Sequence, residues 1–102
     1  MNIQKMTRTA EVVSELMKTL AHPKRLLILC QLVEGERSVG ELARLLDMRE
    51  AAVSQQLTLL RKDKLVATRR EGQTIWYSMP REDVRALLGY LYETYCAKPA
   101  RR

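Results

Sequence analysis

The chain has 102 residues, a length that suits one domain, and 46% of them are hydrophobic, as in an ordinary folded domain. Its net charge of +6 favours a polyanionic partner such as DNA, RNA or an anionic membrane surface, although a need for solubility also explains such a charge. The sequence lacks a run of about 18 apolar residues and the apolar core of a signal peptide, so we expect no membrane span and a cytoplasmic protein.

The N-terminal third predicts two helices. Residues 1–6 are expected to be loose, as chain ends usually are, and a helix is expected over 8–20. Its apolar residues recur at helical spacing, and they are Val12, Val13, Leu16, Met17 and Leu20. Pro23 ends this helix by pushing His22 out of helical geometry, and it suits the first turn of the next helix, over 24–33. That second helix is apolar nearly all round, which predicts a place in the centre of the core.

Residues 38–64 predict two short helices joined by a tight turn. In the first, leucines at helical spacing form one apolar face, and Ser38 is a suitable N-cap. In the second, the expected buried stripe is Val53, Leu57 and Leu60. The opposite face is small, polar and basic, and it consists of Ala51, Ser54, Gln55, Thr58, Arg61 and Lys62. Such a face suits the major groove of DNA, because glutamine pairs with adenine through two hydrogen bonds and arginine or lysine reaches phosphate.

A hairpin is expected after this helix pair. The segments 65–70 and 73–79 predict two strands, and Glu71-Gly72 predicts the turn because glycine supplies the positive φ of a tight hairpin. A helix followed directly by a hairpin is the pattern of a winged helix–turn–helix. The tip of this wing carries Arg69, Arg70 and Gln73, which are placed to contact phosphate or the minor groove. An ordinary solvated turn is the alternative.

A last helix is expected over 81–96, followed by a basic tail at 98–102. The first and last helices keep apolar faces that the rest of the chain does not obviously cover, so we predict a two-fold dimer. Two recognition helices would then face successive major grooves. The residues assigned to the interface are Val12, Val13, Leu16, Val84, Leu87, Leu88, Leu91 and Tyr95. The predicted fold is mainly α with a two-stranded β-wing, a dimeric winged helix–turn–helix in a single domain over 1–102.

Two runs, LAHPKRLLILCQLVEGERSVGELARLL and AAVSQQLTLLRKDKLVATRREGQTIWYSM, resemble the ArsR/SmtB family of dimeric bacterial winged-helix repressors. The resemblance covers about 11–96, with SQQL at the family's recognition helix and GQTIWYSM at its wing. It implies a dimeric repressor that binds operator DNA. The family usually has a serine or threonine cap at the start of the recognition helix, where this chain has Arg49. Either Asp47 caps that helix from upstream, or Arg49 leaves it uncapped and gains a phosphate contact.

The resemblance also calls for a search for metal ligands, since members of the family sense metals through cysteine and histidine clusters. The first helix of the helix–turn–helix contains neither cysteine nor histidine, and the last helix contains acids but no histidine. His22 precedes Pro23 and is more simply a turn or cap residue. Soft-metal sites favour three or four clustered thiolate or imidazole ligands. We therefore expect no metal site and no cofactor.

Cys30 and Cys96 are the only cysteines. From composition alone, the first is a small core hydrophobe and the second a chance terminal thiol. Their contexts, LLILCQL and LYETYCA, resemble those of the sulfide-responsive and biofilm-associated repressors, which sense persulfide through two cysteines. The resemblance implies that a reactive sulfur species modifies one thiolate, at Cys30, and that the other closes a disulfide or polysulfide bridge that weakens operator binding. Inserted sulfur atoms relax the limit of about 7 Å between the Cα atoms of a direct disulfide.

Two other functions stay open at this point. One is an ArsR-type regulator, either a repressor or an activator that displaces another protein, with cysteines that sense nothing. The other is a winged domain that binds proteins rather than DNA. An enzyme is not expected, because the sequence offers no paired carboxylates with a nearby base, no Cys–His neighbourhood, no CxxC and no phosphate-binding glycine loop.

Overall fold

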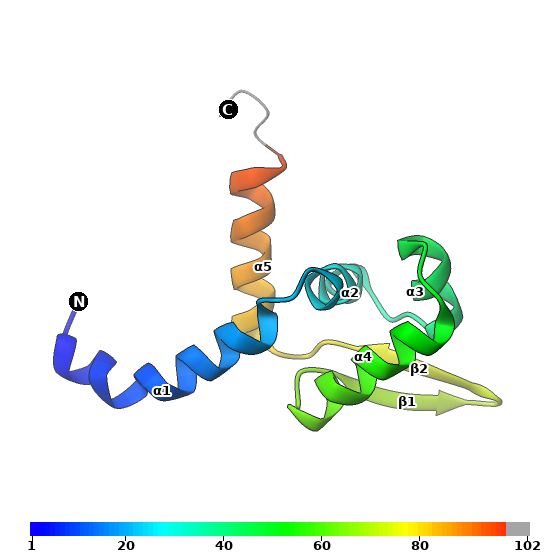
Figure 1. Ribbon diagram of the computed structural model, residues 1–102, viewed down its shortest axis with the longest axis horizontal. Helices are drawn as coiled ribbons and strands as arrows, with labels where there is room; N and C mark the ends of the chain where they lie inside the picture. The colour runs from blue at the N-terminus through cyan, green and yellow to red at the C-terminus, as the bar shows by residue number, and fades with distance from the viewer. Residues whose placement is uncertain (98–102) are drawn as a thin grey trace.

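The computed structural model describes residues 1–97, and the expected order of helices and strands is confirmed (Figure 1). The elements are α1 (Ile3–Leu20), α2 (Pro23–Glu34), α3 (Val39–Leu46), α4 (Glu50–Lys62), β1 (Ala67–Glu71), β2 (Thr74–Ser78) and α5 (Glu82–Tyr95). The basic tail expected at 98–102 lies outside the described residues. Among the residues described, no helix is both long enough and apolar enough to cross a membrane.

Helix α1 begins earlier than expected. The side chain of Asn2 accepts hydrogen bonds from the backbone N–H groups of Gln4 at 2.9 Å and Lys5 at 3.2 Å, which satisfies two of the free donors at the helix start. The prediction of a loose segment over 1–6 is therefore wrong. Leu20 is the only fully buried residue of α1, and most of the helix extends away from the rest of the molecule (Figure 1).

Helix α2 buries only one of its apolar faces. Ile28, Leu29 and Leu32 face the core, whereas Leu27 is 48% exposed and Cys30 is also exposed. The expectation of a helix buried on all sides is wrong, because α1, α3, α4 and β2 pack on α2 without enclosing it. Cys30 and Val33 are left on the side of α2 that faces α5, together with Gln31 and Glu34.

The core lies where α2, α3, α4 and the base of the wing meet. Its buried residues are Leu20, Ile28, Leu29, Leu32, Leu42, Ala43, Val53, Leu57, Leu60, Leu65, Val66, Met79, Val84 and Leu88. Helix α3 starts with a capping box, in which Ser38 accepts from the Glu41 N–H and Glu41 accepts from the Ser38 N–H, both at 3.2 Å. This fixes the entry to the helix–turn–helix.

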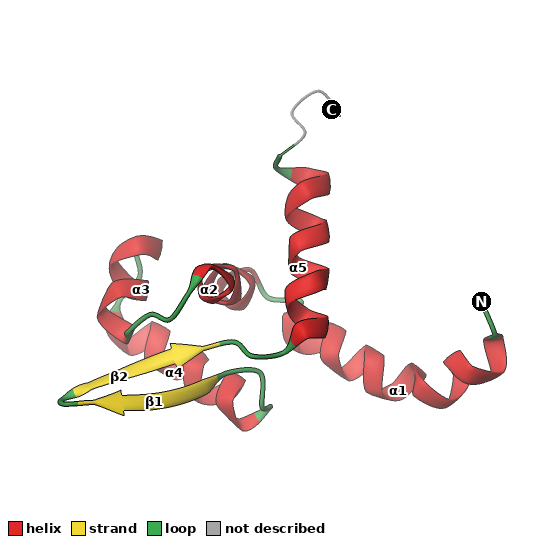
Figure 2. Ribbon diagram, turned by 180° about the vertical axis from the view of Figure 1, so that it is seen from behind, coloured by secondary structure: helices red, strands yellow, loops and turns green. Residues whose placement is uncertain are grey.

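The wing is an antiparallel hairpin in which Arg69 pairs with Trp76 and Arg70 with Ile75 (Figure 2). Gly72 has φ +63°, as a tight hairpin needs, but Glu71 still pairs with Thr74. The turn is therefore Gly72-Gln73, one residue later than predicted. On the outer side of β2, the backbone of Arg37 exchanges two hydrogen bonds with Tyr77, at 2.8 and 3.1 Å. The loop between α2 and α3 thus supports the base of the wing.

Candidate nucleic-acid interface and cysteine pair

Helix α4 separates its apolar and polar faces as the sequence predicts. Val53, Leu57 and Leu60 are completely buried, and each such side chain contributes about 1.5–3 kcal/mol to folding. The six residues assigned to the DNA face are all exposed, and they are Ala51, Ser54, Gln55, Thr58, Arg61 and Lys62. The hydroxyl of Thr58 donates to the carbonyl of Ser54 at 2.9 Å, so in this rotamer it can only accept a hydrogen bond from a partner.

The start of α4 has no side-chain cap. Arg49 occupies the N-cap position with extended backbone and makes no capping hydrogen bond. Asp47 instead ends α3 in the left-handed conformation at φ 52°, so the idea that it caps α4 is wrong. A cap contributes about 1 kcal/mol, which is less than one buried leucine. Packing therefore fixes α4, and its first N–H groups stay open for an anion such as phosphate.

Arg25 holds the recognition helix from behind, a contact that the sequence did not reveal. Its Nε donates to Gln56 Oε1 at 2.9 Å, and its Nη1 donates to the carbonyl of Thr19 at 3.2 Å. The hydroxyl of Thr19 also donates to Asp63, which follows α4, at 3.4 Å. The last turn of α1 is thus tied to the recognition helix. No local sequence pattern indicates a pair that is separated by 31 positions.

The two wing arginines have different surroundings. The Nε of Arg69 contacts both carboxylate oxygens of Glu36, at 2.8 and 3.0 Å, and its Nη1 lies 3.4 Å from a carboxylate oxygen of Glu71. Its guanidinium lies over the Trp76 ring, 5.9 Å from the centroid. The hydrogen bond from Arg69 lowers the pKa of Glu36 below its usual value. Arg70 is exposed and has no ion pair within the described part of the chain, and Gln73 is exposed at the turn.

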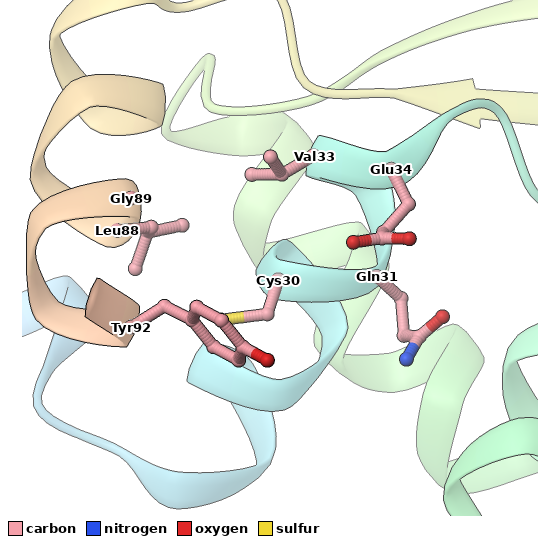
Figure 3. Close-up of a pocket in the computed structure, with 7 residues that line it drawn as sticks. All are labelled: Cys30, Gln31, Val33, Glu34, Leu88, Gly89 and Tyr92. Carbon is pink, nitrogen blue, oxygen red and sulfur yellow. The ribbon is translucent and has the colours of Figure 1, made fainter. Parts of the chain in front are cut away.

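Cys30 lies beside a cavity of about 260 Å³ between α2 and α5 (Figure 3). The lining residues are Cys30, Gln31, Val33 and Glu34 of α2 and Leu88, Gly89 and Tyr92 of α5. The Cys30 side chain is directed at the Tyr92 ring, so it faces α5 rather than the core. Cys30 is exposed, and the alternative that it is a core hydrophobe is wrong.

Cys96 lies at the C-terminal end of α5, on the same side of the helix as Tyr92. Its N–H donates to the Tyr92 carbonyl at 2.8 Å, which places it one turn further along, and its thiol is free and exposed. Partial burial, and to a smaller extent the charge of the Cys96 thiolate, raises the pKa of the Cys30 thiol. The raised pKa also leaves less thiolate at Cys30 for a first attack.

His22 occupies the N-cap position of α2, as the sequence suggests, but its side chain makes no capping bond. Within residues 1–97, no group of three or more histidine, cysteine, aspartate or glutamate side chains is arranged to hold a metal ion.

The residues assigned to a dimer interface fall into two groups. Val12, Val13 and Tyr95 are exposed, and Leu16, Leu87 and Leu91 are partly buried, so all six retain surface for a partner. Val84 and Leu88 are 0% and 4% exposed because they pack into the core of their own chain. Their assignment to the interface is wrong. The apolar spacing of α5 does not distinguish residues that pack into their own chain from residues that stay on the surface.

The architecture is that of a mainly helical winged helix–turn–helix with a two-stranded antiparallel wing. The model of the bacterial regulatory protein arsR family matches residues 22–68. The transcriptional activator HlyU of Vibrio cholerae is 42% identical over 96 residues, which span 94% of this chain and 89% of that protein. The biofilm growth-associated repressor of Agrobacterium fabrum is 46% identical over 92 residues, or 90% of this chain and 79% of that protein.

A solved structure is similar as well. The crystal structure of the transcriptional repressor BigR from Xylella fastidiosa aligns with a TM-score of 0.88 at 41% identity, covering 94% of this chain and 98% of that one. The chain therefore belongs to the ArsR family of bacterial helix–turn–helix regulators, and within it is closely related to BigR and HlyU. It is a DNA-binding transcriptional regulator rather than an enzyme.

Proposed function

We propose that the protein is a dimeric repressor that binds operator DNA through α4 and the wing and that reactive sulfur species release it by joining Cys30 to Cys96. One observation carries this proposal: Cys30 lines the cavity between α2 and α5 together with Tyr92, and Cys96 follows Tyr92 by one helical turn. A bond between the two cysteines would link a core helix to a helix of the proposed interface.

The DNA side of the proposal depends on the exposed residues of α4 and the wing. The polar face of α4 offers Ser54, Gln55 and Thr58 to base edges and Arg61 and Lys62 to phosphates. Arg49, Arg70 and Gln73 complete the residues proposed to contact DNA. Arg69, which the sequence also assigned to DNA, lies beside them on the wing and is already paired with Glu36. The repressor role is supported by the names of two related proteins, the biofilm growth-associated repressor and BigR.

The sulfur chemistry needs only a hydropersulfide, RSSH, and the two thiols. One cysteine thiolate attacks the terminal sulfur of RSSH, which forms a protein persulfide and releases RS⁻. The other thiolate then attacks the cysteine-bound sulfur and expels HS⁻, which leaves a disulfide. If a second RSSH first adds another sulfur and releases RS⁻, the cysteine carries a chain Cys–S–S–SH. The other thiolate then attacks the middle sulfur of that chain and expels HS⁻, which leaves a trisulfide. The donor is the oxidant in each case, and the longer bridge tolerates a wider separation of α2 and α5.

Bridging would change DNA binding through the packing of α2. This helix contacts both helices of the helix–turn–helix, and α5 carries Leu87, Leu91 and Tyr95 of the proposed interface. A bond between α2 and α5 would bias the spacing of the two recognition helices in the dimer. Couplings of this kind are typically about 1–3 kcal/mol, or roughly 5- to 150-fold in affinity.

The test measures operator binding before and after treatment with glutathione persulfide. The parent should lose affinity, and Cys30→Ser and Cys96→Ser should each bind as tightly as the untreated parent and keep that affinity after treatment. Dithiothreitol should restore the parent. Release of both variants to the same extent as the parent would refute the sensor and leave the DNA-binding function intact.

A second candidate is an activator that displaces another protein from DNA. It is favoured by the 42% identity to a protein named as a transcriptional activator. Transcription in vitro from the bare promoter separates the two roles. A repressor lowers the transcript level on its own, whereas a displacing activator raises it only when the other protein is present.

A further inference from the structure

The guanidinium of Arg69 is occupied on several sides within the protein. Its Nε donates a hydrogen bond to Glu36, and its Nη1 lies beside the Glu71 carboxylate. The guanidinium also lies over the ring of Trp76. Glu36 belongs to the loop between α2 and α3, and its neighbour Arg37 pairs with Tyr77 of β2. The contact to Glu36 therefore crosses from the body of the protein, over β2, to β1. The two residues are 33 positions apart in the sequence.

Strand geometry places the two wing arginines on opposite faces. Successive side chains of a strand point to opposite sides of the sheet, and Arg69 pairs with Trp76 while Arg70 pairs with Ile75. The bridge between Arg37 and Tyr77 sets Glu36 on the face of Trp76 by the same alternation. Glu36, Trp76 and Arg69 thus share one face, and Arg70 lies on the other with Ile75.

We propose that Arg69 is a positioning residue that clamps the wing to the loop between α2 and α3, and that Arg70 alone of the two arginines provides the phosphate contact. A two-stranded hairpin is marginally stable by itself, so the direction of its tip depends on such lateral contacts. The Arg37–Tyr77 backbone bonds hold β2, and the Glu36–Arg69 pair holds β1. Arg69 is also flanked by two carboxylates, so its charge is compensated before DNA arrives.

The clamp predicts that Glu36→Gln changes operator affinity in the direction opposite to the one that simple electrostatics gives. Glu36 is an exposed anion on a surface that approaches DNA, so simple electrostatics says that Glu36→Gln should strengthen binding. If Glu36 holds Arg69 and thereby the wing, the same substitution weakens binding. Glu34→Gln, which removes an equal charge at the end of α2, is the matched control, since Glu34 has no ion pair among the residues described.

The experiment measures operator affinity of the whole protein over a series of salt concentrations. We expect Arg69→Ala and Glu36→Gln each to weaken binding about three- to tenfold, and the double variant to lose no more than either single one. The slope of log affinity against log salt should stay unchanged in these variants. Arg70→Ala, the control for Arg69→Ala, should reduce the slope by about one unit.

The fluorescence of Trp76 gives a second measurement of the clamp, and this measurement needs no DNA. Trp76 is the only tryptophan of the chain, and it lies under Arg69, so its emission reports the clamp. Arg69→Ala and Glu36→Gln should change that emission in the same direction, with the helical circular dichroism unaltered. Glu34→Gln should leave it as in the parent.

Three results would overturn the proposal. They are tighter operator binding by Glu36→Gln, a salt slope for Arg69→Ala that falls by about one unit, and additive losses in the double variant. The first two would mean that Arg69 contacts phosphate and that Glu36 merely competes with DNA for it. The outcome is independent of the sulfur chemistry, because all measurements use the reduced protein.

Discussion

Gln55 and Gln56 are neighbours in the sequence, but they have different surroundings. Gln55 is exposed on the polar face of α4, whereas Gln56 is half-buried and accepts a hydrogen bond from Arg25. The periodicity of α4 predicted the exposed position of Gln55 because helical spacing is a local property. The bond from Arg25 to Gln56 depends on how α2 packs against α4, which no local pattern encodes.

These surroundings predict different binding defects. Gln55→Ala should lose base discrimination by about 1–3 kcal/mol at one position of the operator, because its amide is proposed to pair with a base edge. Gln56→Ala should weaken binding to every sequence alike, since it loosens the hold on α4. Competition between the operator and its single-base variants measures both. An equal loss on all sequences for Gln55→Ala would contradict its assigned role.

The sequence predicted which segments form helices and strands better than it predicted what packs against each of them. Helix α2 has an apolar surface all round, yet only one side is covered within the chain. The early start of α1 has a local signal in the capping residue Asn2, which apolar spacing alone does not reveal. The wing was expected from two strand segments and the glycine between them, whereas its lateral support by Glu36 joins distant segments and was not predictable.

The wing support gives a pH prediction. Arg69 lowers the pKa of Glu36 in the folded protein, so the pair is fully formed above the ordinary glutamate range and is lost as the pH falls through the lowered pKa. The emission of Trp76 should therefore change in acid with a midpoint below that of an ordinary glutamate. Glu36→Gln should abolish this transition. An identical transition in the variant would assign it to another carboxylate.

For the whole molecule, the main feature is the apolar surface of α1, which the described part of the same chain does not cover. Val12 is 73% exposed and Tyr95 of α5 is 70% exposed. The sequence predicted that these helices have apolar faces, but it did not separate residues that turn inward, such as Leu88, from those that turn outward. That distinction depends on the position of α2 against α5, which is a property of the assembled fold.

A charge on α1 tests the proposed dimer. Val12→Asp should weaken self-association about tenfold or more, because a carboxylate would be buried without a partner, and operator affinity should fall with it. Sedimentation equilibrium measures the first effect and DNA titration the second. Ser14→Asp adds the same charge off the apolar face of α1 and should leave both unchanged. Unaltered association in Val12→Asp would place the interface elsewhere.

The proposed switch requires that a sulfur bond between Cys30 and Cys96 forms when the protein releases operator DNA. The most direct measurement is peptide mass spectrometry on the protein that glutathione persulfide has released from the operator. The account predicts a cross-linked pair of peptides that contain Cys30 and Cys96 of one chain, joined directly or through an added sulfur atom. Released protein in which the two cysteines are modified separately, or in which neither is modified, would contradict it.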